Sequence, residues 1–153
     1  MSKYKFLFSL TLVATIAPLY AATTFGIIGA FGANNSGAKA VAKSLKQKKP
    51  DFIITVGDNN YPRGCEATID DNIGQHYFEY IGNYHGKYGT GATDNAFFPT
   101  LGKHDWDAKT YCPSGKLLPY QTYFTLPGNT RYYDFVKDNV HFFALDSDPR
   151  EPD

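Results

Sequence analysis

The sequence predicts an α/β domain that begins with a parallel sheet and ends with an antiparallel strand pair. Three short apolar runs, at 25–30, 52–58 and 97–103, each carry a glycine followed by a residue able to reach a ligand. A segment with helical periodicity separates the first two runs, and two more apolar runs flank a turn near the chain end. A strand, a crossover helix and a strand form a right-handed parallel unit, whereas a short turn joins antiparallel strands.

The segment after the first run has the pattern of an amphipathic helix. Ser36 is a suitable N-cap, and Pro50 follows a lysine-rich last turn. The apolar residues with helical spacing are Ala38, Val41, Ala42 and Leu45. The parallel unit built around this helix would bring Ala30 and Asp58 to the same carboxyl edge of the sheet, which is where open α/β sheets bind ligands.

The rest of the chain divides into a helix, two irregular stretches and a hairpin. Apolar and aromatic residues on one face predict a helix over about 69–84, and three glycines indicate a surface loop over 85–96. The segment 106–128 has no sustained periodicity and several prolines, so we expect an irregular excursion there. The runs 131–136 and 140–145 predict two strands of a hairpin.

Size and charge restrict the class of protein. A chain of 153 residues is long enough for one domain of ordinary size. Its 15 basic and 15 acidic side chains give a formal net charge of zero, so the chain lacks the basic character of a general nucleic-acid binder. We expect no nucleic-acid partner.

The first 22 residues have the pattern of a secretory signal. Lys3 and Lys5 precede an apolar stretch at 6–17, and small residues follow Pro18. The stretch is shorter than the roughly 20 residues that span a bilayer, so no stable membrane span is expected, and an uncleaved N-terminal anchor is the weaker alternative. Residues 23–153 would form the exported domain, in a secreted, periplasmic or extracellular location.

The two cysteines, Cys65 and Cys112, agree with an oxidising compartment. They either close a loop as a disulfide or remain two free buried thiols. Their number and separation match no zinc-binding pattern.

Two strand ends carry residues with metal or phosphate chemistry. Asp58 follows Gly57, and Tyr61 lies three residues on, so a carboxylate and a phenol can reach one ion. Carboxylate oxygen suits hard cations, and phenolate suits ferric iron. His104 follows Gly102 after the third run, in the equivalent position of the sheet. We therefore expect Asp58, Tyr61 and His104 to meet at the sheet edge.

These residues resemble known motifs. The segment Gly57-Asp58-Asn59-Asn60-Tyr61 is similar to the Gly-Asp-x-x-Tyr segment of calcineurin-like metallophosphoesterases of the purple acid phosphatase branch. The segment 102–105 resembles the Gly-Asn-His-Asp/Glu segment of that family, and the strand pair near the chain end also resembles it. The resemblance implies a sandwich of two mixed sheets flanked by helices, incomplete here at its C-terminus.

The resemblance also implies a function, hydrolysis of phosphate monoesters at a two-metal site. The family uses iron together with zinc, manganese or a second iron, which polarise the ester and activate water. Carried over by position, Asp58 would bridge the two metals and Tyr61 would bind ferric iron. His104 would contact the phosphate or protonate the leaving oxygen, and no ligand role transfers to Asp105.

The chain departs from the family pattern at three places. Ala30 stands where the first motif has a metal-binding aspartate, and Lys103 stands where the third has a metal-binding asparagine. The later histidine segments of the family would come after the strand that ends near Leu145. The other histidines match no motif and are interpreted as structural: His76, His85 and His141. We therefore expect the metal pair not to be retained and this chain alone to be inactive or very weak.

Two alternatives follow from these departures. In the first, the chain is a non-catalytic relative that binds phosphate groups or a protein, and the ammonium of Lys103 neutralises Asp58 in place of a metal. In the second, the chain pairs with a separate C-terminal segment or associates with itself, because half of a sandwich exposes an apolar face and strand edges.

Overall fold

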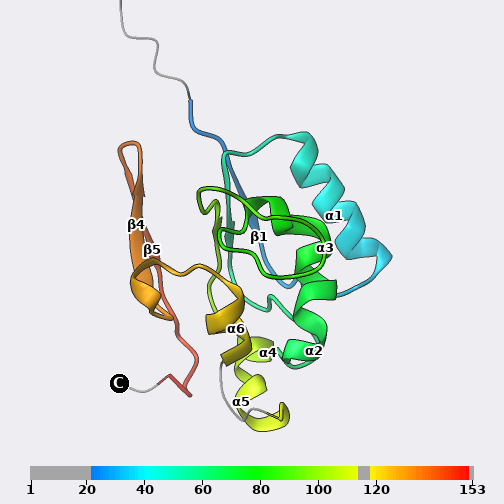
Figure 1. The fold of residues 1–153 in the computed structure, drawn as a ribbon. Helices are drawn as coiled ribbons and strands as arrows, with labels where there is room; N and C mark the ends of the chain where they lie inside the picture. Colours follow the sequence, from blue (N-terminus) through cyan, green and yellow to red (C-terminus); the bar gives the residue numbers. More distant parts are fainter. Residues whose placement is uncertain (1–21, 114–117, 152–153) are drawn as a thin grey trace, which may run out of the picture.

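The computed structural model describes residues 22–113 and 118–151. Figure 1 shows three layers, with helices on one face of a small central sheet and a hairpin on the other. The expected signal segment, residues 1–22, lies outside the described residues except for Ala22. In the described part of the chain, we find no helix with the length and apolar character of a membrane span.

The central sheet is parallel, as the sequence predicts. It consists of β1 (Phe25–Ile28), β2 (Phe52–Thr55) and β3 (Phe97–Phe98), in that order. Strand β3 is shorter than the apolar run suggests, because Pro99 has no N–H for the ladder. The next residue, Thr100, instead donates its backbone N–H to Thr55 Oγ1 at 3.2 Å. This departure from the ladder directs the chain toward the sheet edge.

The crossover helix α1 (Ser36–Gln47) lies on one face of the sheet and buries Ala38 and Ala42. Its N-cap is Asn35 and not the expected Ser36. Asn35 has extended backbone angles, and its side-chain oxygen accepts a hydrogen bond from the N–H of Ala38 at 2.9 Å. That bond satisfies one of the free donors of the first turn, so the helix begins one residue after the asparagine.

The second expected helix is real but interrupted, and its predicted bounds are wrong at both ends. A π-helical segment that ends at Gly74 interrupts the helix. At the start of this segment, Asp70 Oδ1 accepts hydrogen bonds from the hydroxyls of Tyr84 at 2.5 Å and Tyr123 at 2.7 Å. A side chain at position 74 would collide with these groups. The successive pieces are α2 (Glu66–Ile69), η1 (Asp70–Gly74), α3 (Gln75–Tyr77) and η2 (Phe78–Tyr80).

The segment expected to be irregular contains short helices. These are too short to produce the periodicity that identifies a helix in a sequence. The helices are α4 (Lys103–Trp106), α5 (Ala108–Tyr111), α6 (Leu118–Tyr123) and η3 (Pro127–Asn129). Phe124, after α6, stacks on Phe97 of β3 with ring centroids 5.5 Å apart, so this segment covers the helical face of the sheet.

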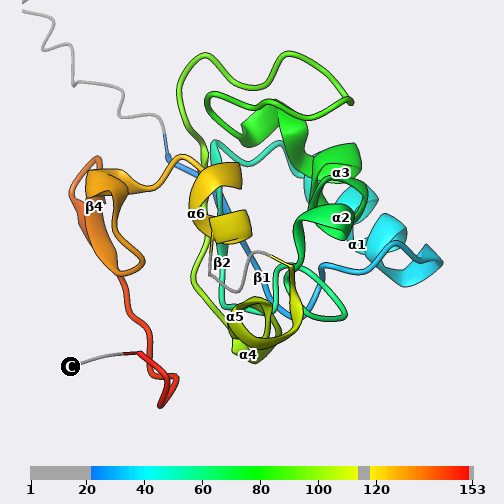
Figure 2. The ribbon, with the colours of Figure 1, turned by 60° about the horizontal axis from the view of Figure 1, so that its bottom comes forward.

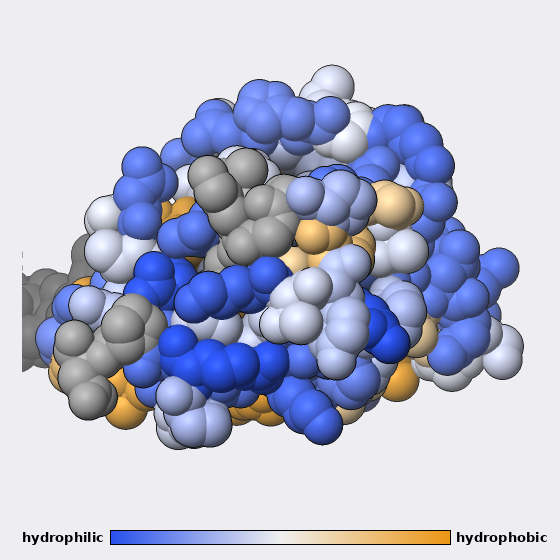
Figure 3. Space-filling model, turned by 90° about the horizontal axis from the view of Figure 1, so that it is seen from below, coloured by the Kyte–Doolittle hydropathy of each residue, from blue (hydrophilic) through white to orange (hydrophobic). Residues whose placement is uncertain are grey.

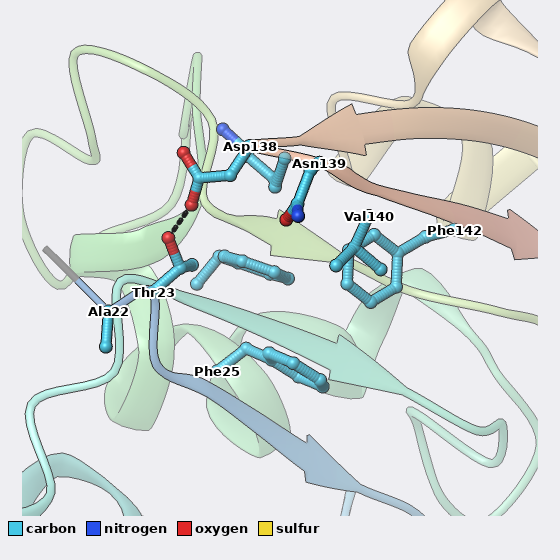
Figure 4. Close-up of a pocket in the computed structure, with 9 residues that line it drawn as sticks. Ala22, Thr23, Phe25, Asp138, Asn139, Val140 and Phe142 are labelled. Atoms are coloured by element: carbon cyan, nitrogen blue, oxygen red, sulfur yellow. Dashed lines mark hydrogen bonds between the residues drawn. The ribbon is translucent and has the colours of Figure 1, made fainter. Parts of the chain in front are cut away.

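The predicted hairpin is confirmed, with strands β4 (Tyr133–Lys137) and β5 (Val140–Ala144). It packs on the other face of the sheet through aromatic rings, with Phe135 stacked on Phe98 at 3.9 Å. A cavity of about 630 Å³ opens between the hairpin turn and the start of β1 (Figure 4). Thr23 donates a hydrogen bond to Asp138 across its mouth. The described residues thus form one parallel and one antiparallel sheet, and neither is mixed.

Candidate functional site

The carboxyl ends of β1 and β2 meet at one edge, as predicted. The backbone N–H of Ala30 donates to the carbonyl of Gly57 at 3.0 Å, which ties the two strand ends together. Helix α4 follows β3 and lies beyond this edge (Figures 1 and 2). Gly102 is required here, because a Cβ at this position would overlap the backbone nitrogen of Asp58. The close approach brings α4 onto the loop that carries the predicted site residues.

Asp58, Tyr61 and His104 come together as the sequence predicts. The Tyr61 hydroxyl donates to Asp58 Oδ2 at 3.1 Å, and the backbone N–H of His104 donates to Asp58 Oδ1 at 3.0 Å. The Tyr61 and His104 rings lie with centroids 4.4 Å apart. Asp58 has a positive φ of 55°, a conformation that aspartate tolerates better than most residues.

One hydrogen bond fixes the His104 ring. Its Nδ1 lies 2.7 Å from the carbonyl oxygen of Pro62. A carbonyl oxygen can only accept, so Nδ1 carries a proton and Nε2 is the nitrogen left for a ligand. The ring is therefore oriented by the same loop that carries Asp58 and Tyr61.

Tyr61 is a neutral phenol in this arrangement. Partial burial raises its pKa above the usual value, and the hydrogen bond to Asp58 and the negative charge of that carboxylate raise the pKa further. A metal ion bound at Asp58 would reverse this electrostatic effect, because it would favour the phenolate.

The sequence analysis assigned no role to Asp105, whose side chain holds the site loop in place through hydrogen bonds. Its side chain is 2% exposed. Its carboxylate accepts the backbone N–H groups of Asn59 at 3.1 Å, Asn60 at 3.2 Å and Gly102 at 2.9 Å, and also Asn59 Nδ2 at 2.9 Å. The carboxylate thereby joins the loop after β2 to the start of α4. The spacing Gly-x-x-Asp at a helix start was the signal that could have identified it.

Burial raises the pKa of Asp105 from 3.8 to about 6, although the hydrogen bonds from Asn59 and Gly102 oppose the shift. Between about pH 4 and pH 6, the Asp105 carboxyl group is therefore protonated in the folded state and ionised in the unfolded state. The contribution of Asp105 to stability should be full below about pH 4 and should fall as the pH rises to about 6. We expect the carboxyl carbon of Asp105 to titrate near pH 6 by NMR. A midpoint below 4 would show that its hydrogen bonds outweigh its burial.

A buried amide network supports the loop beside Asp105. Asn59 and Asn60 are both almost fully buried. Asn60 Nδ2 donates to the carbonyl of Cys65 at 2.8 Å, and its Oδ1 accepts Asn72 Nδ2 at 2.8 Å. Cys65 is bonded to Cys112, with Cα atoms 5.4 Å apart. The cysteines, for which the sequence left two possibilities, thus form a disulfide that links the site loop to the end of α5.

Lys103 does not neutralise Asp58. The Lys103 side chain is exposed, and the ion pairs of the described residues include none between it and Asp58. Its carbonyl accepts Arg150 at 3.1 Å, and the Arg150 guanidinium also pairs with Asp107 at 2.9 Å. The proposed replacement of a metal by the Lys103 ammonium is therefore wrong for this structure, because the start of α4 directs residue 103 outward.

The described residues do not provide the ligands of a two-metal site. Asp58 and Tyr61 are in contact, but position 30 offers only the methyl group of Ala30, and Asp105 is occupied by N–H donors. In residues 22–113 and 118–151, no group of three or more His, Cys, Asp or Glu side chains could hold a metal ion. Since a stable site takes at least three protein ligands, these residues alone do not fit the metal pair.

The face that carries the site is polar. Figure 3 looks at the molecule from the side of α4 and α5, and hydrophilic residues cover most of what is visible. The 630 Å³ cavity lies elsewhere, at the hairpin turn, and none of its lining residues belongs to the site. The three site residues are partly buried at this polar face.

Comparisons with protein families, curated proteins and solved structures found no match to this chain. The resemblance to the metallophosphoesterase family therefore stays a prediction from the two sequence motifs.

Proposed function

We propose that the chain belongs to an exported metallophosphoesterase of the calcineurin-like, purple acid phosphatase type that acts on phosphate monoesters. The observation that carries the proposal is the contact among Asp58, Tyr61 and His104 at the carboxyl edge of a parallel sheet. The layered arrangement, with helices on one sheet face and a hairpin on the other, is compatible with the two-sheet sandwich of that family. The disulfide is compatible with export.

Each residue has a role that its geometry permits. Asp58 and Tyr61 would supply two oxygen ligands to one metal ion, and His104 Nε2 would contact a phosphate oxygen. A bound metal pair would supply the charge that attracts the ester and activates water. The remaining ligands would have to come from residues outside those described, so the chain by itself should not hold the pair.

Because the described residues lack ligands for the metal pair, the chain alone should be inactive. We expect the chain alone to hydrolyse p-nitrophenyl phosphate no faster than buffer, with iron, zinc or manganese present. Reading the gene and its transcript past codon 153 should reveal segments that carry histidine ligands. The longer product should be active and should lose about a hundredfold or more in kcat/KM on Asp58→Asn or His104→Gln. An active product that tolerates both changes, or the absence of such segments, would contradict the proposal.

A non-catalytic binding module is the second candidate. It is favoured by the hydrogen bonds of Asp58, whose two oxygens both accept a donor and so need no metal for stability.

Several large apolar side chains are also exposed, at Ile27, Val56, Phe143 and Leu145. These favour a complementing C-terminal segment or self-association, which a monomeric elution with a cooperative melt would exclude.

A further inference from the structure

A second polar feature lies between α1 and α3, which run side by side in Figure 1. A shallow groove of about 520 Å³ separates them. Its lining contains no carboxylate and consists of Lys39, Ala42, Lys43, Lys46, Gln47, Gln75 and His76. None of these residues contacts Asp58, Tyr61 or His104, so the groove is separate from the candidate site.

Three lysines give the groove a positive charge. Lys39, Lys43 and Lys46 lie at positions i, i+4 and i+7 of α1, on one face of the helix. They cover about 10 Å of its length, at 1.5 Å per residue. Lys46 pairs with Glu79 at 3.1 Å, whereas Lys39 and Lys43 have no ion pair within residues 22–113 and 118–151.

A histidine nitrogen in the same groove lacks a partner. Nε2 of His76 is buried, and no hydrogen bond reaches it from the described residues. Lys46 Nζ donates to the backbone carbonyl of His76 at 3.0 Å, and burial together with the charges of Lys46 and Lys39 lowers the pKa of His76. Buried polar atoms are nearly always hydrogen-bonded, so this nitrogen is free to take a partner from water or from a ligand in the groove.

We propose that this groove binds an oligophosphate anion, with Lys39, Lys43 and His76 as its contacts. Lysine binds phosphate oxygens as a point charge, and the lining contains no arginine fork of the kind that favours a planar carboxylate. Lys39 and Lys43 lie four residues, or about 6 Å, apart along the helix, and His76 adds a third contact, so the ligand that fits carries more than one phosphate group. A soluble oligophosphate and a multiply phosphorylated lipid headgroup share this chemistry.

Calorimetric titration with inorganic tripolyphosphate tests the proposal. We expect one binding event per chain, weakened about tenfold or more by Lys39→Gln with Lys43→Gln. The matched control is Lys48→Gln with Lys49→Gln, which removes the same charge at the end of the same helix but outside the groove. The control pair should change the affinity by less than about twofold, because screening weakens distant charges. Asp58→Asn should leave it unchanged, which separates this proposal from the proposed phosphatase site.

His76→Phe removes the nitrogen but keeps an aromatic ring. The variant should melt no lower than the parent, because it eliminates an unpaired buried atom, yet it should bind tripolyphosphate more weakly. Sedimentation with phosphatidylcholine vesicles that contain phosphatidylinositol bisphosphate distinguishes a lipid source from a soluble one. Absence of binding in both assays at low salt, equal losses in the two lysine pairs, or unchanged affinity in His76→Phe would overturn the proposal.

Discussion

Replacing Asp105 with alanine should lower the free energy of unfolding by about 4 kcal/mol. The change removes the acceptor of four N–H groups: the backbone N–H groups of Asn59, Asn60 and Gly102, and one of the two side-chain N–H groups of Asn59, whose amide still donates to the carbonyl of Thr100 at 2.6 Å. Each unpaired buried donor costs about 1–3 kcal/mol, and relief from burying the carboxylate offsets part of the total. Denaturant unfolding of parent and variant at pH 7 measures the difference.

Asp94→Ala provides the control, because Asp94 is exposed and its removal should change stability by less than about 0.5 kcal/mol. Asp105→Asn should fall between the two, since an amide keeps one accepting oxygen. If Asp105→Ala loses no more than Asp94→Ala, the carboxylate does not hold the site loop against α4.

Removing the disulfide should have an effect of similar size. The Cys65–Cys112 bond closes a sequence separation of 47 residues, and loop-entropy arithmetic gives about 4 kcal/mol for such a loop. The double variant Cys65→Ala with Cys112→Ala should therefore unfold at a much lower denaturant concentration than the oxidised parent. The bond also anchors the loop whose Cys65 carbonyl accepts Asn60, so the site loop should loosen with it.

A reductant distinguishes the effect of losing the disulfide bond from the effect of replacing the cysteine side chains. Dithiothreitol should destabilise the parent to about the level of the double variant and should leave the double variant unchanged. The oxidised parent should also show no reactive thiol, since the described residues contain no free cysteine. Two titratable thiols, or a loss below about 1 kcal/mol, would contradict this account.

The parallel half of the fold could be predicted because its signals are local. Apolar runs and an amphipathic helix identify a strand, a crossover and a strand, and the handedness of that unit fixes which ends share an edge. The same signals fail for α4 and α5, which are four residues each and shorter than two helical turns. They also fail at Gly74, where the interruption depends on hydroxyls of Tyr84 and Tyr123 that come from distant segments.

The candidate site was predictable for a related reason. Asp58 and His104 follow strands of one sheet, so topology alone brings them together, and Tyr61 follows in the same turn. The role of Asp105 was not predicted because its partners Asn59 and Asn60 lie 46 and 45 residues away in the sequence. Its bonds to them also come from backbone N–H groups, which almost every residue has and which therefore give no sequence signal. The direction of Lys103 was mispredicted because charge complementarity with Asp58 says nothing about which way the first residue of α4 points.

We propose that Asp58 and Tyr61 belong to a metal site that lacks a carboxylate at Ala30. Ala30 is exposed, has a positive φ of 50° and bonds to Gly57 beside Asp58. Aspartate tolerates this conformation well, so Ala30→Asp should add a carboxylate at the edge without strain. Lys103→Asn removes an exposed cation next to His104.

Calorimetric titration of Mn²⁺ or Zn²⁺ into Ala30→Asp with Lys103→Asn measures whether this edge of the sheet can bind a metal. We predict affinity about tenfold or more above the parent, because the variant gains a carboxylate at position 30 beside Asp58 and loses one positive charge. The gain should disappear when Asp58→Asn is added. Equal affinities of parent and double variant, or a gain that survives Asp58→Asn, would contradict the assignment of this edge as a metallophosphoesterase site.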